Sequence, residues 1–210
     1  FSMFYDLEDP IQFAKEINES LAEDGVWIFE QSYLPQMIET NSFDTICHEH
    51  LEFYSLKQID WILKEADLKV IDVEFNNING GSFSVTAAKI NSHYHPKTKH
   101  LQKIRNDELA LGLDSIDVFN NFKINIDKNC KLLMKFLIGA KKKNKSVYGL
   151  GASTKGNVLL QYCGIDNTLI KAIGDVNEDK YGSYTPGTLI PLISEEEVLK
   201  RDPDYLLILP

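Results

Sequence analysis

The chain has 210 residues, 43% of them hydrophobic, so it can form one large domain or two small ones with real cores. Its 31 Asp and Glu residues outnumber its 22 Lys and Arg residues, which gives a formal net charge of −9. Nucleic-acid binding depends on neutralising phosphates, so this charge excludes a general polyanion binder and leaves room for one small phosphate ligand at a local basic spot. No apolar run approaches the roughly 20 residues of a membrane span. We therefore expect neither nucleic acid nor a membrane among the partners.

The three cysteines, Cys47, Cys130 and Cys163, show no paired spacing. This pattern predicts reduced thiols and a cytoplasmic location, because disulfide frameworks belong to oxidising compartments. The opening FSMFYDLEDP resembles the end of a strand that runs into a helix cap, and the closing DYLLILP resembles a strand. From these two ends we expect the chain to be a fragment of a longer protein.

The first ninety residues are typical of the second half of an α/β sheet that finishes with an antiparallel hairpin. Strand, helix and strand in succession favour a parallel sheet with crossover helices. Ser55 and Gln58 have the spacing of a capping box, which marks a helix start. The predicted elements are a helix from Asp9-Pro10 to Gly25, a strand at 26–30, a helix at 55–68, and strands at 69–75 and 82–89 around a turn at Gly80-Gly81.

The second half of the sequence indicates a linker, a long helix and another α/β unit. Residues 91–100 are polar, whereas apolar residues recur at helical spacing from about 115 to 143. The elements that follow are a strand at 146–151, a helix at 154–163, a strand at 169–174, a strand or loop at 188–193, a helix at 194–201 and a strand at 205–210. We therefore expect an α/β fold with a sheet-forming part at 1–92, a linker and long helix at 93–144, and a second Rossmann-like domain at 145–210.

A polar cluster at 47–50 is the first candidate for chemistry. Cys47, His48, Glu49 and His50 follow one another just before the predicted helix cap. A His beside a Glu can act as a general base if the carboxylate sets its tautomer. The cluster also follows the strand at 26–30, and ligands of open α/β sheets sit at the carboxyl ends of strands.

Two other interpretations of this cluster stay open. His48 and His50 would share a face of an extended segment, which makes half of a zinc site with His93, His95 or Cys47. The spacing matches no common zinc pattern, so we predict no metal site. The residues could also be surface polar groups.

The stretch GLGASTKGN (149–157) is the second candidate. It follows a predicted strand and opens a predicted helix, so glycine backbone, helix N–H groups and Lys155 could hold a phosphate. Asp175 closes the next predicted strand, where a ribose-binding acid sits in a dinucleotide fold. The alternative is a tight turn without a ligand. Gly80, Gly81 and Ser82 likewise form either a loop near a substrate or an ordinary hairpin turn.

Several stretches together resemble the S-adenosylmethionine-dependent sugar C-methyltransferases. The resemblance covers essentially the whole chain and rests on FYDLEDP (4–10), DGVWIFEQSYLP (24–35), NSFDTICHEHLEFYSL (41–56), GGSFSV (80–85), GLGASTKGNVLLQYCGI (149–165) and YTPGTLIP (184–191). Members of that family have an N-terminal zinc-binding module, a central methyltransferase domain and a C-terminal Rossmann-like domain. The resemblance implies that this chain is the C-terminal portion, with the zinc cysteines and the main S-adenosylmethionine loop upstream.

The resemblance also implies residue roles. His50 would be the base that forms an enolate next to a sugar ketone, with Glu49 as partner, His48 beside them, and Cys47 where well-known members carry a Tyr. Residues 2–6 and 30–33 would line the donor cleft, with Phe4, Tyr5, Glu30 and Gln31 as cofactor contacts. The nucleotide-sugar, expected as a thymidine diphosphate sugar, would contact Gly80, Gly81, Ser82, Gly149, Gly151, Ala152, Ser153, Lys155, Gly156, Asn157 and Asp175.

The family resemblance predicts a methyltransferase whose 210-residue portion alone is inactive. Two other classes remain: a nicotinamide-dependent oxidoreductase that binds its dinucleotide at 146–175, and a non-catalytic nucleotide-binding module. The Glu49–His50 pair is the feature that separates an enzyme from a module.

Overall fold

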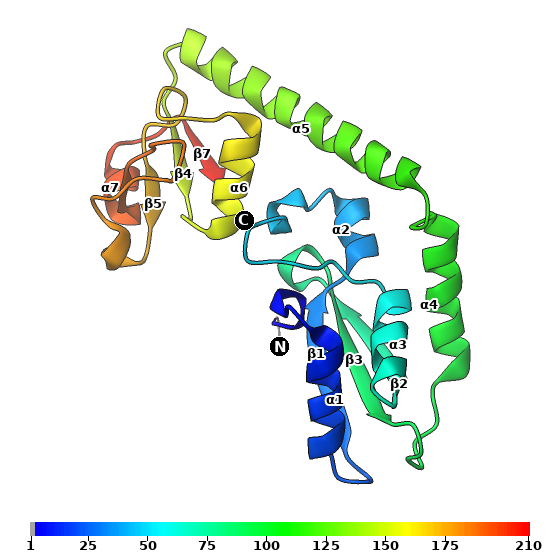
Figure 1. Cartoon of the computed structure of the whole chain (residues 1–210). Helices are drawn as coiled ribbons and strands as arrows, with labels where there is room; N and C mark the ends of the chain where they lie inside the picture. The colour runs from blue at the N-terminus through cyan, green and yellow to red at the C-terminus, as the bar shows by residue number, and fades with distance from the viewer. Residues whose placement is uncertain (1–2) are drawn as a thin grey trace. The chain divides into compact units, whose positions relative to one another are not determined.

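The computed structural model describes residues 3–210, apart from the side chain of Asn79, as two compact units. The first unit runs to Ser42 and continues from His48 to Phe122; the second contains Phe43–Cys47 and Lys123–Pro210. Figure 1 shows helices and strands in both units. One sheet is antiparallel and the other parallel, which confirms the predicted α/β class with a hairpin-ended sheet followed by a Rossmann-like unit.

The sheet of the first unit has its last strand in the middle. β1 (Val26–Ser32) and β2 (Leu68–Asn76) both pair with β3 (Ser82–Lys89), in the order β1-β3-β2. Both pairings are antiparallel, so β1 and β2 point the same way without touching each other. The expectation of parallel neighbours is therefore wrong for the pairs described, because β3 is inserted between the two strands. The predicted hairpin of β2 and β3 is confirmed.

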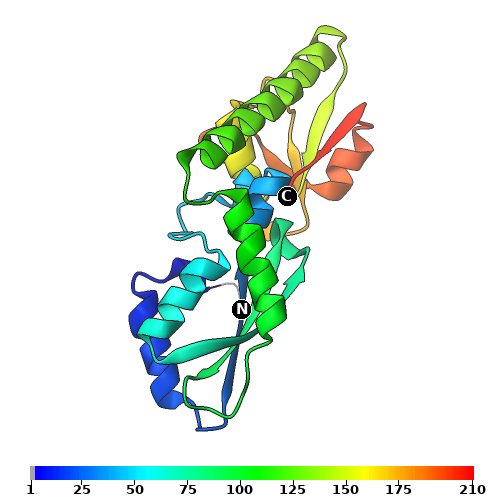
Figure 2. The same cartoon turned by 90° about the vertical axis from the view of Figure 1, so that its right-hand side faces the viewer.

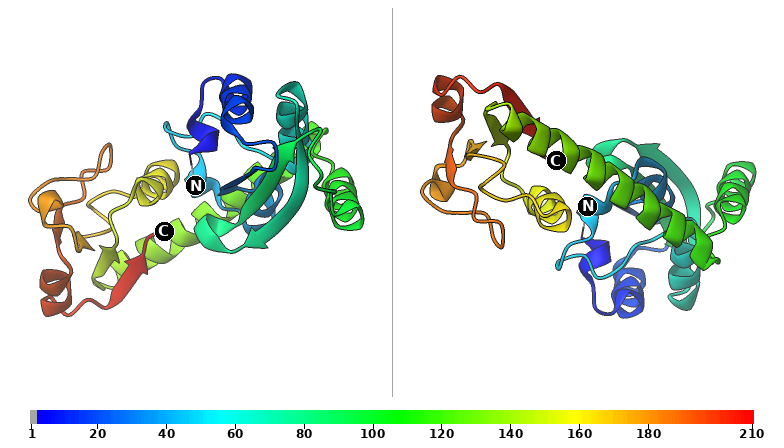
Figure 3. Two further views of the ribbon diagram at one scale, coloured as in Figure 1. Left: turned by 90° about the horizontal axis from the view of Figure 1, so that it is seen from below. Right: turned by 90° about the horizontal axis from the view of Figure 1, so that it is seen from above.

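Helices cover one face of this sheet. Phe29 of β1 lies opposite Val85 of β3, which lies opposite Val73 of β2, and all three side chains are buried. Because side chains alternate along a strand, the other face carries the exposed Val26 and Ile28. The covering helices are α1 (Pro10–Ser20), α3 (Leu56–Glu65) and α4 (Thr98–Leu111), which lie along the sheet in Figures 2 and 3.

Local capping explains where α1 and α3 begin. The carboxylate of Asp9 accepts a hydrogen bond from the N–H of Gln12 at 2.9 Å, and Pro10 opens α1. At α3 the backbone N–H of Ser55 donates to Oε1 of Gln58 at 3.1 Å, so the predicted capping box is confirmed. The capping box fixes the direction in which the chain leaves the 47–50 cluster.

Three elements of the first unit differ from expectation. Residues Phe4–Asp6 form a 3-10 turn rather than a strand end, because Phe4 and Tyr5 both turn into the core. The short helix α2 (Leu34–Thr40) follows β1 directly. α4 begins at Thr98, inside the predicted polar linker. Few of its side chains are buried, so its sequence shows only a narrow apolar stripe. A second 3-10 turn, η3 (Ile78–Gly80), forms the hairpin tip.

The second unit is a doubly wound parallel sheet. Its strands are β4 (Val147–Leu150), β5 (Ile173–Asp175), β6 (Leu192–Ser194) and β7 (Tyr205–Ile208), in the order β6-β5-β4-β7. The helices are α5 (Ile116–Lys142), α6 (Thr154–Cys163) and α7 (Glu195–Lys200), with the turns η2 (Phe43–Thr45) and η4 (Glu178–Lys180). Leu137 and Leu160 from α5 and α6 share one buried cluster, while Val198 of α7 packs with Tyr148 in another. No helix within residues 3–210 is both long and apolar enough to span a bilayer.

Two of the three cysteines are bonded, which corrects the expectation of three reduced thiols. Cys130 of α5 and Cys163 at the end of α6 form a disulfide with a Cα–Cα distance of 5.2 Å, whereas Cys47 is a free thiol. Their separation of 33 residues gave no sign of pairing. The partnership arises because α5 and α6 lie against the same sheet face, which is a tertiary property.

A Cys130→Ser variant should be less stable than the parent chain by about 2–3 kcal/mol under oxidising conditions, because the disulfide closes a long loop in the unfolded chain. The measurement is denaturant unfolding with and without dithiothreitol. Cys47→Ser is the matched control and should respond to reductant like the parent. Equal unfolding midpoints for Cys130→Ser and the oxidised parent would show that the bond does not stabilise the unit.

Candidate active site and glycine loop

The segment that carries the His-Glu-His cluster is fastened to the carboxyl end of β1. The backbone N–H groups of Leu51 and Glu52 both donate to the carbonyl of Tyr5, at 3.0 and 3.1 Å. The carbonyl of Tyr54 accepts from the N–H of Leu34 at 2.9 Å, directly after β1. The fold therefore brings the predicted 4–6 and 48–54 segments together in one unit, while Ser2 lies outside the described residues.

His50 is the enclosed member of the cluster. Its ring lies against Tyr5 with centroids 4.3 Å apart, and the side chain is half-buried. By contrast, the side chains of His48 and Glu49 are 83% and 59% exposed, with Nε2 and Oε1 3.9 Å apart. The contact described for Glu49 thus goes to His48, and its role as the partner of His50 stays a prediction. Cys47 is half-buried and belongs to the second unit.

Two buried polar side chains of the first unit, Gln31 on β1 and Tyr54 just after the cluster, have no hydrogen bond to any part of the chain that the structure describes. Gln31 is 0% exposed and both atoms of its amide are unpartnered, as is the hydroxyl of Tyr54. Burial, and to a lesser degree the carboxylate of Glu52, raises the pKa of the Tyr54 hydroxyl well above its usual value, so it remains a donor. Native interiors pair nearly all such groups, so these two are candidates to meet a ligand. Glu30 lies half-buried on the opposite face of β1.

The hairpin tip at Gly80, Gly81 and Ser82 is shaped by packing against α2. A Cβ on Gly81 would lie 2.3 Å from the side chain of Gln36, and one on Gly80 would lie 2.6 Å from Oγ of Ser42. Both glycines have positive φ, and the carbonyl of Gly81 accepts from the N–H of Tyr33. Ser82 is buried and donates to the carbonyl of Ile78 at 3.0 Å. Contacts within the chain therefore explain why Gly80, Gly81 and Ser82 occupy these positions. Their contact with a substrate stays a prediction.

The glycine loop lies where the strand order of the second unit reverses. β4 has β5 on one side and β7 on the other, so the chain that leaves β4 enters the crevice where open parallel sheets bind ligands. Ser153 caps α6: its Oγ accepts from the N–H of Gly156 at 2.9 Å and donates to the carbonyl of Pro210. Lys155 and Asn157 are half-buried in the first turn of α6.

Packing determines two of the glycines in this loop. A Cβ on Gly149 would lie 2.8 Å from Cγ1 of Ile173, and one on Gly156 would lie 3.2 Å from Cβ of Leu209. Gly149 lets β5 approach β4 closely, and Gly156 lets α6 approach the residue that follows β7. Gly151 differs because its φ of +86° requires a residue that tolerates the left-handed region. The loop is thus a tight turn from β4 into the start of α6, and its contact with a phosphate stays a prediction.

The carboxylate of Asp175 is engaged with the glycine loop. It accepts from the N–H of Ala152 at 2.7 Å, the N–H of Asn177 at 2.8 Å and the ammonium of Lys180 at 3.0 Å. Burial raises the pKa of the Asp175 carboxyl, but these three donors outweigh it and hold the pKa below its usual value. Contact of Asp175 with a ligand stays a prediction. Lys180 was not anticipated because nothing in its sequence neighbourhood marks it.

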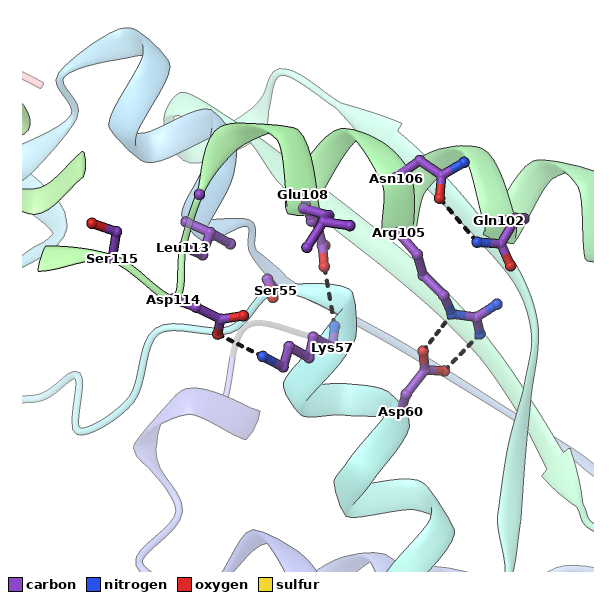
Figure 4. A pocket seen from close by; sticks show the side chains of 12 residues that line it. Ser55, Lys57, Asp60, Gln102, Arg105, Asn106, Glu108, Leu113, Asp114 and Ser115 are labelled. Carbon is purple, nitrogen blue, oxygen red and sulfur yellow. Dashed lines mark hydrogen bonds and ion pairs between the residues drawn. The ribbon is translucent and has the colours of Figure 1, made fainter. Parts of the chain in front are cut away.

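A cavity of about 580 Å³ lies between α3 and α4, away from the predicted residues (Figure 4). Its charged groups are paired: Arg105 binds Asp60 through two hydrogen bonds, and Lys57 binds Asp114. Glu108 at its edge is 5% exposed and serves the start of α3. Within residues 3–210 no group of three His, Cys, Asp or Glu side chains is placed to hold a metal ion.

Comparison with known proteins agrees with this architecture. A family model described as the C-methyltransferase C-terminal domain matches residues 77–210, and a general methyltransferase domain model matches residues 1–73. The chain is 30% identical over 206 residues to the C-methyltransferase NovU of Streptomyces niveus, an alignment that covers 98% of this chain. The chain spans about half (49%) of the length of that relative. Since the first model covers well over half of its residues, the chain belongs to the C-methyltransferase family.

Proposed function

We propose that this chain is part of an enzyme that transfers the methyl group of S-adenosylmethionine to a carbon of a nucleotide-linked keto-sugar, with His50 as the base. The observation that carries the proposal is the half-buried imidazole of His50 against Tyr5, in the same unit as the unpartnered amide of Gln31 and hydroxyl of Tyr54. Ligands of open α/β sheets sit at this end of the strands.

S-adenosylmethionine, when bound, supplies an electrophilic methyl group. Phe4, Tyr5, Glu30 and Gln31 are the residues of this chain proposed to line its site. The fit rests on Gln31, because its buried amide offers donors and an acceptor that the described chain leaves unused.

The chemistry assigned to this chain is proton removal. Carbon next to a ketone becomes nucleophilic when a base takes its proton and the electrons move onto the ketone oxygen. His50 would accept that proton, and the neutral hydroxyl of Tyr54 could donate to the oxygen that gains charge. The carbon activated in this way would be the acceptor of the methyl group that S-adenosylmethionine would supply, with the thioether as the leaving group. Glu49 is proposed to set the tautomer of His50, which requires its carboxylate to turn away from His48.

The glycine loop is proposed to hold the diphosphate of the nucleotide-sugar. Its position at the reversal of strand order, the helix start behind it, and the charge of Lys155 support this assignment. Ser153 would contact the phosphate only after its hydroxyl is released from the carbonyl of Pro210.

Calorimetric titration tests the ligand assignment. The chain should bind thymidine diphosphate and should not bind NAD, while S-adenosylmethionine serves as the third ligand. A Lys155→Met variant should weaken the nucleotide by roughly 1–2 kcal/mol, because a charge-assisted bond to phosphate is lost. Binding of NAD in place of thymidine diphosphate would contradict the proposal and indicate an oxidoreductase.

A further inference from the structure

Asp175 stands where dinucleotide-binding folds place the acid that bonds a ribose hydroxyl, at the end of the second strand of the unit. Its carboxylate is only slightly exposed, and both oxygens already accept hydrogen bonds from the protein. Oδ2 takes the N–H of Ala152 together with the ammonium of Lys180, and Oδ1 takes the N–H of Asn177. Three of the about four acceptor positions of the carboxylate are therefore occupied, which leaves at most one on Oδ1 for a ribose hydroxyl.

Lys180 completes a closed ring around one peptide residue. Besides its bond to Asp175, its ammonium donates to the carbonyl of Ala152 at 2.7 Å. Ala152 is therefore held on both sides, with its N–H on Asp175 and its C=O on Lys180. The hydroxyl of Tyr181 adds a bond to the carbonyl of Asp175 at 3.0 Å, which fixes the end of β5 as well. We call Asp175, Lys180 and Ala152 the loop brace.

Ala152 is the residue between Gly151, whose φ is +86°, and Ser153, which caps α6. Gly151 can adopt many backbone conformations, so something outside the loop must select one. The loop brace does so, and it leaves Lys180 to neutralise a carboxylate that would otherwise repel a phosphate nearby.

We propose that Asp175 and Lys180 are positioning residues, which hold the glycine loop in its phosphate-binding form and do not contact the ribose. This inference rests on the proposed nucleotide-sugar site. The second unit would then select a nucleoside diphosphate by its phosphates and discriminate against NAD, because the acid needed to accept both hydroxyls of the ribose diol keeps at most one acceptor position for them.

Amide hydrogen exchange tests the brace without any ligand. In Asp175→Asn and in Lys180→Met, exchange at residues 151–153 should accelerate about tenfold or more. Lys180→Met removes the bond to the Ala152 carbonyl, and Asp175→Asn leaves one uncharged acceptor oxygen for three donors. Asp179→Asn and Lys171→Met are matched controls on exposed side chains of the same unit and should exchange like the parent. Exchange that rises evenly over β4 and α6, with a lowered Tm, would indicate general destabilisation and overturn the positioning role.

Titration with thymidine diphosphate then measures the effect on binding. Each single variant should bind about tenfold more weakly, and the double variant should be no weaker than either, because both changes release the same peptide. Additive losses with unchanged exchange would mean that the two side chains touch the ligand, which would overturn the proposal. If the parent chain binds no thymidine diphosphate, the proposed function fails, whereas the exchange result still decides whether the brace orders the loop. If Asp175→Asn does not fold, hydrogen exchange and titration of Lys180→Met alone test the proposal.

Discussion

A His50→Gln variant should lose methyl transfer by about 100- to 10,000-fold, the contribution typical of a general base. The imidazole is the enclosed member of its cluster and lies against Tyr5, so glutamine can replace part of its volume without taking a proton. Because the proposed base would act on the carbon and not on the nucleotide, thymidine diphosphate should bind with unchanged affinity. The measurement is kcat with S-adenosylmethionine and the keto-sugar in an active preparation of the enzyme.

His48→Gln is the matched control, since it removes the same group two residues away from a side chain that is 83% exposed. It should retain turnover within about threefold, because surface side chains without a reacting partner contribute little. The turnover of Glu49→Gln should lie between those of His50→Gln and His48→Gln if the carboxylate of Glu49 turns to His50 in the parent. Loss of turnover in His48→Gln with full activity in His50→Gln would reverse the two roles. Loss of nucleotide binding in His50→Gln would place the residue outside the chemistry.

Glu108→Ala should destabilise the first unit by about 3–5 kcal/mol, because two buried donors and one partly buried donor lose their acceptor at once. The carboxylate of Glu108 accepts from the N–H of Leu56 at 2.6 Å, the N–H of Lys57 at 3.2 Å and the hydroxyl of Tyr33 at 2.8 Å. Figure 4 draws the bond from Lys57. Burial, reinforced by Glu108, raises the pKa of the Tyr33 hydroxyl well above its usual value, so this donor persists at every ordinary pH. The measurement is urea unfolding.

Two further variants serve as comparisons for the unfolding free energy of Glu108→Ala. Glu108→Gln keeps an acceptor oxygen and should lose about 1–2 kcal/mol, the difference between a charged and a neutral hydrogen bond. Asp107→Asn, one residue earlier on the exposed side of α4, should unfold like the parent. If Glu108→Ala unfolded within about 1 kcal/mol of the parent, water would be satisfying the start of α3 and the carboxylate would be dispensable.

Local signals made much of this fold predictable from the sequence. β3 and α6 have the predicted bounds, because turn residues mark the ends of the strand and Ser153 and Gly164 mark those of the helix. The capping box of α3 likewise depends only on residues within four positions, from Ser55 to Gln58. In each case the residues that determine the element are its own neighbours in the chain.

The features that escaped prediction depend on residues far apart in the sequence. Cys130 and Cys163 meet because two helices share a sheet face, and Glu108 meets Leu56 across 52 positions. α4 was hidden for a related reason, since one of its few buried side chains is this charged residue. The candidate site divides in the same way: the order of residues 47–50 suggested chemistry, but only the fold separates the enclosed His50 from the exposed His48.

The central place of β3 determines when the first sheet can assemble during synthesis. Ser32 at the end of β1 pairs with Ser82, fifty residues later, and β2 has no other strand partner among those described. At ribosomal rates of about 5–20 residues per second, β1 waits roughly 3–10 seconds for its neighbour. Trp27 and Phe29, stacked 4.1 Å apart in the finished sheet, lack their neighbouring strand during that time. A nascent chain arrested before residue 82 should therefore be the form that binds chaperones most strongly, and release of eight more residues should end that dependence.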